Sequence, residues 1–321
     1  MHKYLGLNMN YFFLLIMLSN LVNAQIIKPI YKFKASGFVN DFVVNKNKLY
    51  IATDRGIVDV YDLKSKKIIN QIALNPLETG HGKLVDAIIS SIDVVDDKVL
   101  ILSRTMSGYK NVWLYEKHKL RLIIDESKYL AIKEARFIDN EKMMFSTLGA
   151  DVILHDFSES YNMYRTHISD SSIGDYKLSQ DKKTMAMADE SGAVTIVNVA
   201  DSKILKQPTP QNLDNIYHIA YENGVVLTAG QDRRVGVYPK NGSPYYIKTS
   251  FLVYCVGLSP SAKVGVYTKG EKNVLQLFNP QTKQNLHSLV GHKGIVNQIK
   301  FTKENEFYSS DRGEHVYFWK F

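Results

Sequence analysis

The side chains with the clearest chemical potential lie close together near the C-terminus: His292, Ser309, Ser310, Asp311 and Trp319. A serine, a histidine and an aspartate are the residue types of a hydrolase triad, in which the histidine takes the serine proton and the carboxylate orients the imidazole. The same types also suit a structural role, because a buried carboxylate and a buried indole N–H both need hydrogen-bond partners. The elements that position these side chains therefore decide between the two interpretations.

No other catalytic or cofactor signature accompanies them in the sequence. The chain contains no GxSxG, no HExxH and no phosphate-binding glycine loop. Its single cysteine, Cys255, can form no internal disulfide, and we expect it to be a small buried hydrophobic residue. Further histidines are scattered without metal-ligand spacing, at His81, His118, His155, His167, His218, His287 and His315. We therefore expect a non-enzyme without a cofactor or a metal.

Short β-rich segments recur along the whole chain. They begin at positions 58, 112, 152, 194, 235, 274 and 316, with separations of 54, 40, 42, 41, 39 and 42 residues. A period of about 40–45 residues, built from short strands with period-two alternation, is typical of a β-propeller. The sequence therefore predicts an all-β, seven-bladed propeller that forms one domain over residues 25–321.

The last repeat ends at Phe321 after only three strands. A further strand, Ile30–Ala35, precedes the first repeat and has no blade of its own. We expect it to pair beside Val316–Trp319, because this closes the ring and removes two exposed sheet edges.

The C-terminal repeat resembles a WD40 repeat. Gly291 and His292 precede its first strand, a turn containing Asp311 follows its second strand, and its third strand ends in Trp319. The resemblance implies a structural hydrogen-bonded relay, rather than a triad, made by His292, Ser309 or Ser310, Asp311 and Trp319. The other repeats lack the Gly–His pair and replace the tryptophan, although a turn acid remains at Asp54, Asp189 and Asp232.

Residues 1–24 have the character of a signal peptide. Lys3 precedes a short apolar core at 11–18, and Ala24 stands before a cleavage site near Ala24–Gln25. The apolar run is shorter than the roughly 20 residues that span a bilayer. We expect export to the periplasm with no membrane span after cleavage, and an uncleaved anchor helix is the alternative.

The formal net charge of +8 raises the question of acidic partners. Lysines are scattered and form no basic run, so the balance favours acidic protein partners or a solvated surface over nucleic acid. We expect a monomer that binds a protein partner.

Loops on a rigid scaffold commonly carry recognition residues, and three turns here carry an Asp-Arg pair. Their arginines are Arg55, Arg233 and Arg312. The longest departures from the repeat are the loop 75–83, which contains His81, and the turn 104–111. We hypothesise a cationic docking patch over blades seven, one and two, made by Arg55, Arg312, Tyr109, Lys110 and the loop 75–83, with Arg233 as a further candidate. The alternative is that each arginine merely solvates a turn capped by its aspartate.

The export signal, size and divergent repeats look similar to the NapL family of periplasmic nitrate reductase accessory proteins. This resemblance implies a non-catalytic role in maturation of, or electron supply to, that reductase, with its subunits as partners. Two alternatives stay open: a general periplasmic scaffold in envelope assembly, and a propeller hydrolase or lactonase with a metal in its central channel.

Overall fold

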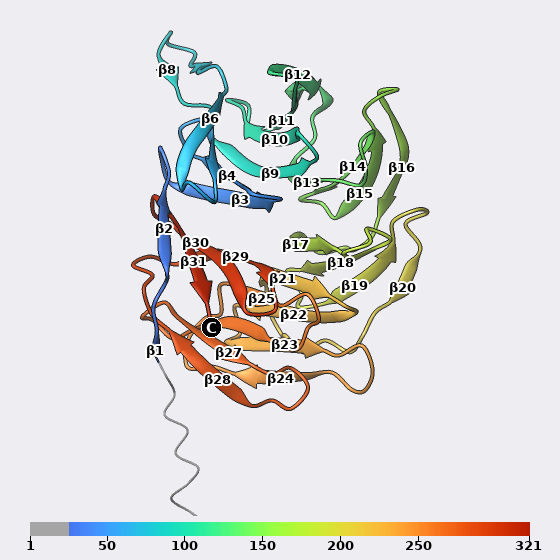
Figure 1. Cartoon of the computed structure of the whole chain (residues 1–321). Coiled ribbons are helices and arrows are strands. Elements are labelled where there is room, and N and C mark those ends of the chain that lie inside the picture. The colour runs from blue at the N-terminus through green and yellow to red at the C-terminus, as the bar shows by residue number, and fades with distance from the viewer. Residues whose placement is uncertain (1–25) are drawn as a thin grey trace, which may run out of the picture.

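The computed structural model describes residues 26–321 as seven antiparallel sheets arranged in a ring (Figure 1). This confirms the predicted all-β, seven-bladed propeller. The predicted signal peptide and its cleavage site at Ala24–Gln25 lie outside the described residues. Within the described part of the chain, no helix is long and apolar enough to cross a membrane.

Each blade runs from an innermost first strand to an outermost fourth strand. Blade one consists of β3 (Val39–Asn45), β4 (Lys48–Thr53), β5 (Ile57–Asp62) and β6 (Lys67–Ala73), and blade two of β9 (Ile89–Val95), β10 (Lys98–Arg104), β11 (Lys110–Glu116) and β12 (Lys119–Ile124). Blade three consists of β13 (Ile132–Phe137), β14 (Lys142–Thr147), β15 (Asp151–Asp156) and β16 (Tyr161–His167). Blade four consists of β17 (Ile173–Leu178), β18 (Thr184–Asp189), β19 (Val194–Asn198) and β20 (Ile204–Lys206). Blade five consists of β21 (Ile216–Glu222), β22 (Val225–Gly230), β23 (Arg234–Tyr238) and β24 (Tyr245–Lys248). Blade six consists of β25 (Val256–Leu258), β26 (Gly265–Lys269), β27 (Val274–Phe278) and β28 (Asn285–Leu289). Blade seven contains β29 (Val296–Lys303), β30 (Glu306–Asp311) and β31 (His315–Lys320).

The N-terminal strand closes the ring as predicted. β2 (Tyr31–Lys34) pairs antiparallel with β31, so that it becomes the fourth strand of blade seven. The register places Phe33 opposite Val316, and both side chains are buried. The third strand of blade seven, β31, is therefore paired along both of its edges.

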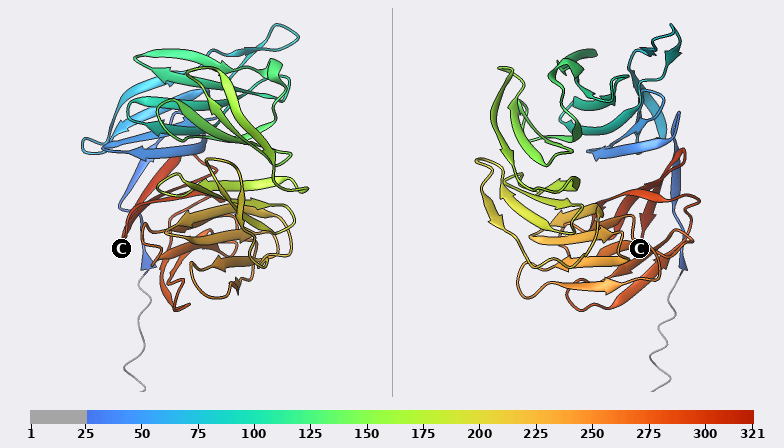
Figure 2. Two further views of the ribbon diagram at one scale, coloured as in Figure 1. Left: turned by 90° about the vertical axis from the view of Figure 1, so that its right-hand side faces the viewer. Right: turned by 180° about the vertical axis from the view of Figure 1, so that it is seen from behind.

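Three features of the fold exceed the repeat pattern. β1 (Ile26–Ile27) pairs parallel with β28 and gives blade six a fifth strand. In Figure 2 the same N-terminal segment passes from the edge of blade six to blade seven. The link between blades one and two forms a small hairpin, β7 (Leu77–Glu78) and β8 (Leu84–Val85), which projects from the body (Figure 1). The 3-10 turn η2 (Glu126–Lys128) lies between blades two and three.

The hydrophobic core lies between the blades. Seven buried clusters each combine residues of two neighbouring sheets, including the cluster of blades seven and one around Phe33, Phe42 and Tyr308. Second strands such as β4 are buried on both faces, whereas outer strands such as β6 are mostly exposed. This burial explains why the inner strands read as nearly continuous apolar runs.

Antiparallel order also defines two faces of the ring. The link face carries the connections between successive blades and the turns between second and third strands. The hairpin face carries the turns between first and second strands and between third and fourth strands.

Candidate functional site

The first strands surround the centre of the propeller, and each contacts the first strands beside it around the ring. In six blades the pairing between first and second strand shifts register near the start of the first strand. Such a bulge leaves one residue unpaired and re-aims the side chains beside it. The residue after the shift is polar in all six: Asp41, Ser91, Glu134, Asp175, His218 and Gln298. Cys255 holds the corresponding place in the sequence of blade six.

Two residues further along each strand stands a second set of inward side chains, because alternate residues of a strand share a face. These side chains are Asp93, Arg136, Lys177 and Lys300 in blades two, three, four and seven. The polar residues of the two sets form what we call the channel network.

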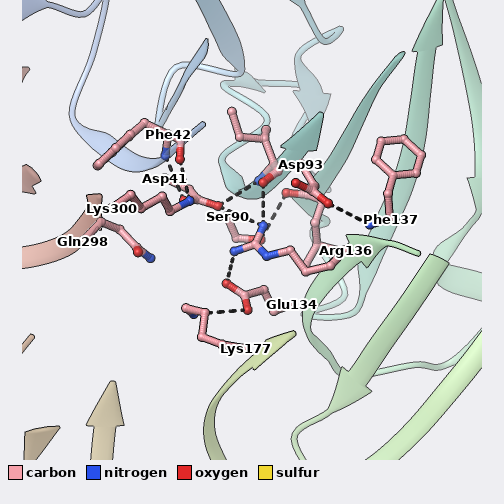
Figure 3. Close-up of polar contacts among 12 residues, drawn as sticks. Asp41, Phe42, Ser90, Asp93, Glu134, Arg136, Phe137, Lys177, Gln298 and Lys300 are labelled. Atoms are coloured by element: carbon pink, nitrogen blue, oxygen red, sulfur yellow. Dashed lines mark hydrogen bonds and ion pairs between the residues drawn. The ribbon is translucent and has the colours of Figure 1, made fainter. Parts of the chain in front are cut away.

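Asp41 is the centre of the channel network (Figure 3). Its carboxylate accepts a hydrogen bond from Lys300 Nζ at 2.8 Å and another from Arg136 Nη1 at 3.3 Å. Arg136 Nη2 also donates to Glu134 Oε1. Since Asp41, Arg136 and Lys300 belong to blades one, three and seven, these contacts cross the ring rather than follow a single sheet.

A second part of the channel network lies over blades four, five and seven. Lys177 Nζ lies 2.9 Å from Asp175 Oδ1 and 3.7 Å from Glu134 Oε2. His218 Nε2 lies 3.3 Å from Gln298 Oε1, so this contact again joins blades that are not neighbours. The centre of the propeller is therefore closed at this level by paired side chains.

Carboxylates of the channel network also fasten neighbouring first strands together. Asp41 Oδ2 accepts from the backbone N–H of Ile92, and Asp175 Oδ2 accepts from that of Ile219. These side chains therefore satisfy backbone donors of the next blade as well as charged partners, which a buried carboxylate requires.

Burial and ion pairing compete in setting the charges. Burial opposes the ionisation of Asp41, but Lys300 and Arg136 outweigh it and lower the pKa of this carboxyl to about 2. Burial likewise opposes the charge of Arg136, and the carboxylates of Glu134 and Asp41 raise its pKa. Burial raises the pKa of Glu134 despite its cationic neighbours. Burial also lowers the pKa of Lys300, although Asp41 opposes this shift. The arrangement consists largely of opposed charges that neutralise one another.

Across residues 26–321, no group of three or more His, Cys, Asp or Glu side chains is placed to hold a metal ion. Cys255 is fully buried, and burial raises the pKa of its thiol.

The predicted relay residues of blade seven lie in one hydrogen-bonded chain. Trp319 Nε1 donates to Ser309 Oγ at 2.7 Å, and the same oxygen lies 2.7 Å from His292 Nε2. His292 Nδ1 lies 3.1 Å from Asp311 Oδ2. Ser309 is fully buried and already accepts from the indole, so its oxygen is not presented to a substrate as in a hydrolase.

The sequence left Ser309 and Ser310 as alternatives, and the structure places only Ser309 in the relay. Ser310 Oγ donates instead to Asn297 Oδ1 at 2.7 Å, because successive residues of a strand point to opposite faces. Asn297 in turn donates to the carbonyl of Val39, so Ser310 supports the contact between blades seven and one.

Blade five contains a related arrangement that the sequence pattern did not reveal. Thr228 Oγ1 donates to Asn212 Oδ1, and Asn212 Nδ2 donates to Asp232 Oδ1 at 2.9 Å. Asn212 thus stands between a hydroxyl and a turn acid as His292 does in blade seven. The Gly–His pair that marks the relay of blade seven is absent from blade five, since the bridging residue there is an asparagine.

Two of the predicted docking residues flank one link. Asp54 N donates to Phe38 O at 3.1 Å, and Val39 N donates to Gly313 O at 2.9 Å. The link from blade seven to blade one therefore lies between the turns that carry Arg55 and Arg312, and both arginines are exposed. Asp54 Oδ1 also accepts from the N–H of Phe38, so this aspartate bonds to the link that precedes its blade.

The remaining docking candidates also lie in links or in turns between second and third strands, and so on the link face, but at other places round the ring. The exposed His81 lies on the loop of the β7–β8 hairpin, and Arg233 lies far round the ring in blade five. Tyr109 packs edge-on against Tyr129, with ring centroids 5.4 Å apart. Lys110 turns toward the carbonyl of blade three's Lys133, and burial lowers its pKa to about 8, so it is a poor cationic contact.

Comparisons with known proteins support the fold alone. No protein-family model and no curated protein sequence matches the chain. Among solved structures, it is similar to a chain in the crystal structure of the mitotic checkpoint complex, with a TM-score of 0.74 and 14% sequence identity over 94% of both chains. This likeness to a WD40-type propeller identifies the architecture as that of a seven-bladed β-propeller.

Proposed function

We propose that the protein is a non-catalytic platform that binds a protein partner through its link face. The observation that carries this proposal is the exposed aromatic ring of Phe38, 55% accessible, between the turns of Arg55 and Arg312. Aromatic and arginine side chains supply much of the binding energy in protein interfaces. We call Phe38, Arg55 and Arg312 the link-face patch.

The chemistry of the link-face patch favours an acidic partner with an apolar anchor. Arginine offers a planar fork of donors that pairs with a carboxylate through two hydrogen bonds. Phe38 can bury its ring against an apolar side chain of the same partner segment. Exposed Met106 and Tyr129 lie on the same face, in a turn of blade two and in the link that follows it.

The partner and compartment are narrower proposals that rest on sequence resemblance. Export to the periplasm follows from the character of residues 1–24, and the similarity to NapL proteins makes periplasmic nitrate reductase subunits the first partner to test. A general scaffold in envelope assembly would use the same link-face patch with a different partner.

The test is affinity capture from the periplasm of the native host grown with nitrate, followed by mass spectrometry. The double variant Arg55→Glu and Arg312→Glu should recover at least about tenfold less partner, because charge reversal in an interface opposes a complementary surface. Arg233→Glu is the matched control, since it reverses an arginine in the same type of turn on blade five.

Each result has a distinct meaning. Nitrate reductase subunits lost only with the double variant would support both the patch and the narrower proposal. Envelope-assembly proteins lost in the same way would support the platform and reject the nitrate reductase role. Equal capture by the wild type, the double variant and Arg233→Glu would reject the link-face patch.

A further inference from the structure

A cavity of about 340 Å³ opens below the channel network, on the hairpin side of the ring. Its inner end is lined by Arg136, Lys177, His218 and Lys300. Its rim includes Lys182 and Glu222, which lie at the hairpin ends of blades four and five. The cavity therefore lies on the opposite side of the network from the link face.

The channel network is polarised along the propeller axis. Its central carboxylates, Asp41, Glu134 and Asp175, are the third residues of their strands, whereas Arg136, Lys177 and Lys300 lie further toward the hairpin face. The three cations line the cavity together with one carboxylate of the network, Asp93, whereas Asp41, Glu134 and Asp175 do not line it. The network thus presents more positive than negative groups to the cavity, where an anion would be stabilised.

Donor capacity remains among these cations. An ammonium group has three N–H donors, and Lys300 Nζ uses two of them on Asp41 Oδ1 and the carbonyl of Phe42. Lys182 on the rim forms no ion pair among residues 26–321. Two cationic side chains can therefore contact an anionic group without breaking the channel network.

The walls of the cavity suit a carbon skeleton. Ala220 and Gly257 stand, in blades five and six, at the position that holds a long cationic side chain in blades three, four and seven. Leu178, Leu258 and Phe301 add apolar surface. A concave, largely apolar space of a few hundred Å³ with a few convergent polar groups is typical of small-molecule sites.

His218 is a further residue on the wall of the cavity, and it is 5% exposed. Its Nε2 faces Gln298 Oε1 and, at 3.9 Å, Asp175 Oδ2, so two oxygens favour a proton on Nε2. Its Nδ1 has no hydrogen-bond partner and no accessible surface within the described chain, so His218 offers the cavity ring surface rather than an open acceptor.

We propose that this cavity binds a small carboxylate. Its carboxylate contacts Lys300 at the inner end, Lys182 adds positive charge at the rim, and its carbon skeleton packs against the apolar walls. This site is separate from the link-face patch, so it adds a small-molecule ligand to a protein-binding platform.

Isothermal titration calorimetry with D-gluconate, D-galacturonate and L-malate tests the ligand class. At least one should bind about tenfold more tightly than D-galactose, which lacks a charge, since this control removes the contact with Lys300. Absence of binding by all three carboxylates at millimolar concentration would overturn the proposal. Equal binding of the neutral sugar would also overturn it.

The substitution Lys182→Glu tests whether the ligand binds in this cavity. It should weaken binding about fivefold to tenfold, because it reverses a charge on the rim. Lys183→Glu is the matched control, since Lys183 is the exposed neighbour and does not line the cavity. Equal effects of the two substitutions, with unchanged thermal unfolding, would mean that the ligand binds elsewhere.

The pH dependence of binding gives a second test, in which Glu222 is substituted and every cationic residue is kept. Burial raises its pKa to about 7, whereas burial lowers the pKa of His218 to about 4, so Glu222 changes charge near neutral pH and His218 does not. The charged groups lining the same cavity are Asp93, Arg136, Lys177, Lys182 and Lys300. Carboxylate binding should tighten from pH 8 to pH 6 as Glu222 becomes neutral, and Glu222→Gln should remove this dependence. A variant that keeps the full dependence would contradict the placement of the ligand beside Glu222.

Discussion

Two buried polar clusters stabilise this propeller, and they differ in the distance along the chain between their members. The relay joins His292, Ser309, Asp311 and Trp319, all of which belong to blade seven or the link before it. The channel network joins residues of different blades, and its contact between Lys300 and Asp41 spans 259 positions. The relay can therefore form with one blade, whereas the channel network is complete only in the closed ring.

The chemical character of the clusters follows the same division. The relay contains one carboxylate and otherwise uses neutral donors and acceptors, because burial lowers the pKa of His292. The channel network consists largely of opposed full charges, whose burial is tolerated only while every partner is present. Removal of one side chain should therefore lower the free energy of unfolding more in the channel network than in the relay.

The largest expected effect comes from Arg136→Met. The substitution keeps an apolar stem of similar length but leaves Glu134 without its guanidinium partner and removes one contact of Asp41. Breaking a buried ion pair by removing one partner costs about 3–5 kcal/mol. Urea unfolding, followed by tryptophan fluorescence, should report this loss in the free energy of unfolding.

The double variant Glu134→Gln and Arg136→Met is the control for this prediction. It also removes the carboxylate that would otherwise stay buried and unpaired, so it should be more stable than Arg136→Met alone. A single variant that loses less than about 1 kcal/mol would show that the charges are not strongly coupled. The channel would then resemble the relay energetically.

The sequence predicted the fold because every signal for it is local and repeated. The third strands recur at nearly constant spacing, and the unassigned strand Ile30–Ala35 matched the strand missing from blade seven. Trp319 and His292 lie in one repeat, so a resemblance to one repeat motif could bring them together. The parallel pairing of β1 was not predicted, because two residues carry no detectable alternation.

The channel network was missed for a physical reason. Its members are one or two polar residues in each of several repeats, and only the folded ring brings Asp41, Arg136 and Lys300 together. A signal was nevertheless present: an aliphatic residue, any residue and a polar residue recur at six of the seven first strands, as in 39–41 and 173–175. Read across the repeats, this pattern marks the residues that surround the centre.

An intermediate effect is expected from acid, which acts on both clusters in the same pH range. Burial opposes ionisation of Asp311, but hydrogen bonds from His292 and from the backbone outweigh it, and its pKa is lowered to about 2, as that of Asp41 is. A carboxyl with a lower pKa in the folded chain stabilises the fold above its unfolded pKa, near 3.8. For Asp41 this contribution is about 2 kcal/mol, and it is lost as the pH falls from about 4 to 2.

Urea titrations at pH 5, 4 and 3 should therefore show falling stability, with a shallower fall in Asp41→Asn and in Asp311→Asn. Each variant lacks one of the two titrating carboxyls, although each is less stable than the wild type at pH 5. A wild-type slope retained by Asp41→Asn would show that the channel network does not contribute to acid unfolding.

The smallest difference is expected inside blade seven, between two adjacent and fully buried serines. Ser309→Ala leaves the Trp319 N–H and His292 Nε2 without their shared partner, which should cost about 1–2 kcal/mol. Ser310→Ala removes one bond to Asn297 and should cost about 1 kcal/mol or less. Only Ser309→Ala should shift the emission of Trp319, because only it changes the indole hydrogen bond. Equal losses from both variants would mean that the relay adds nothing beyond ordinary buried hydrogen bonds, and that the contrast between the two clusters is one of charge alone.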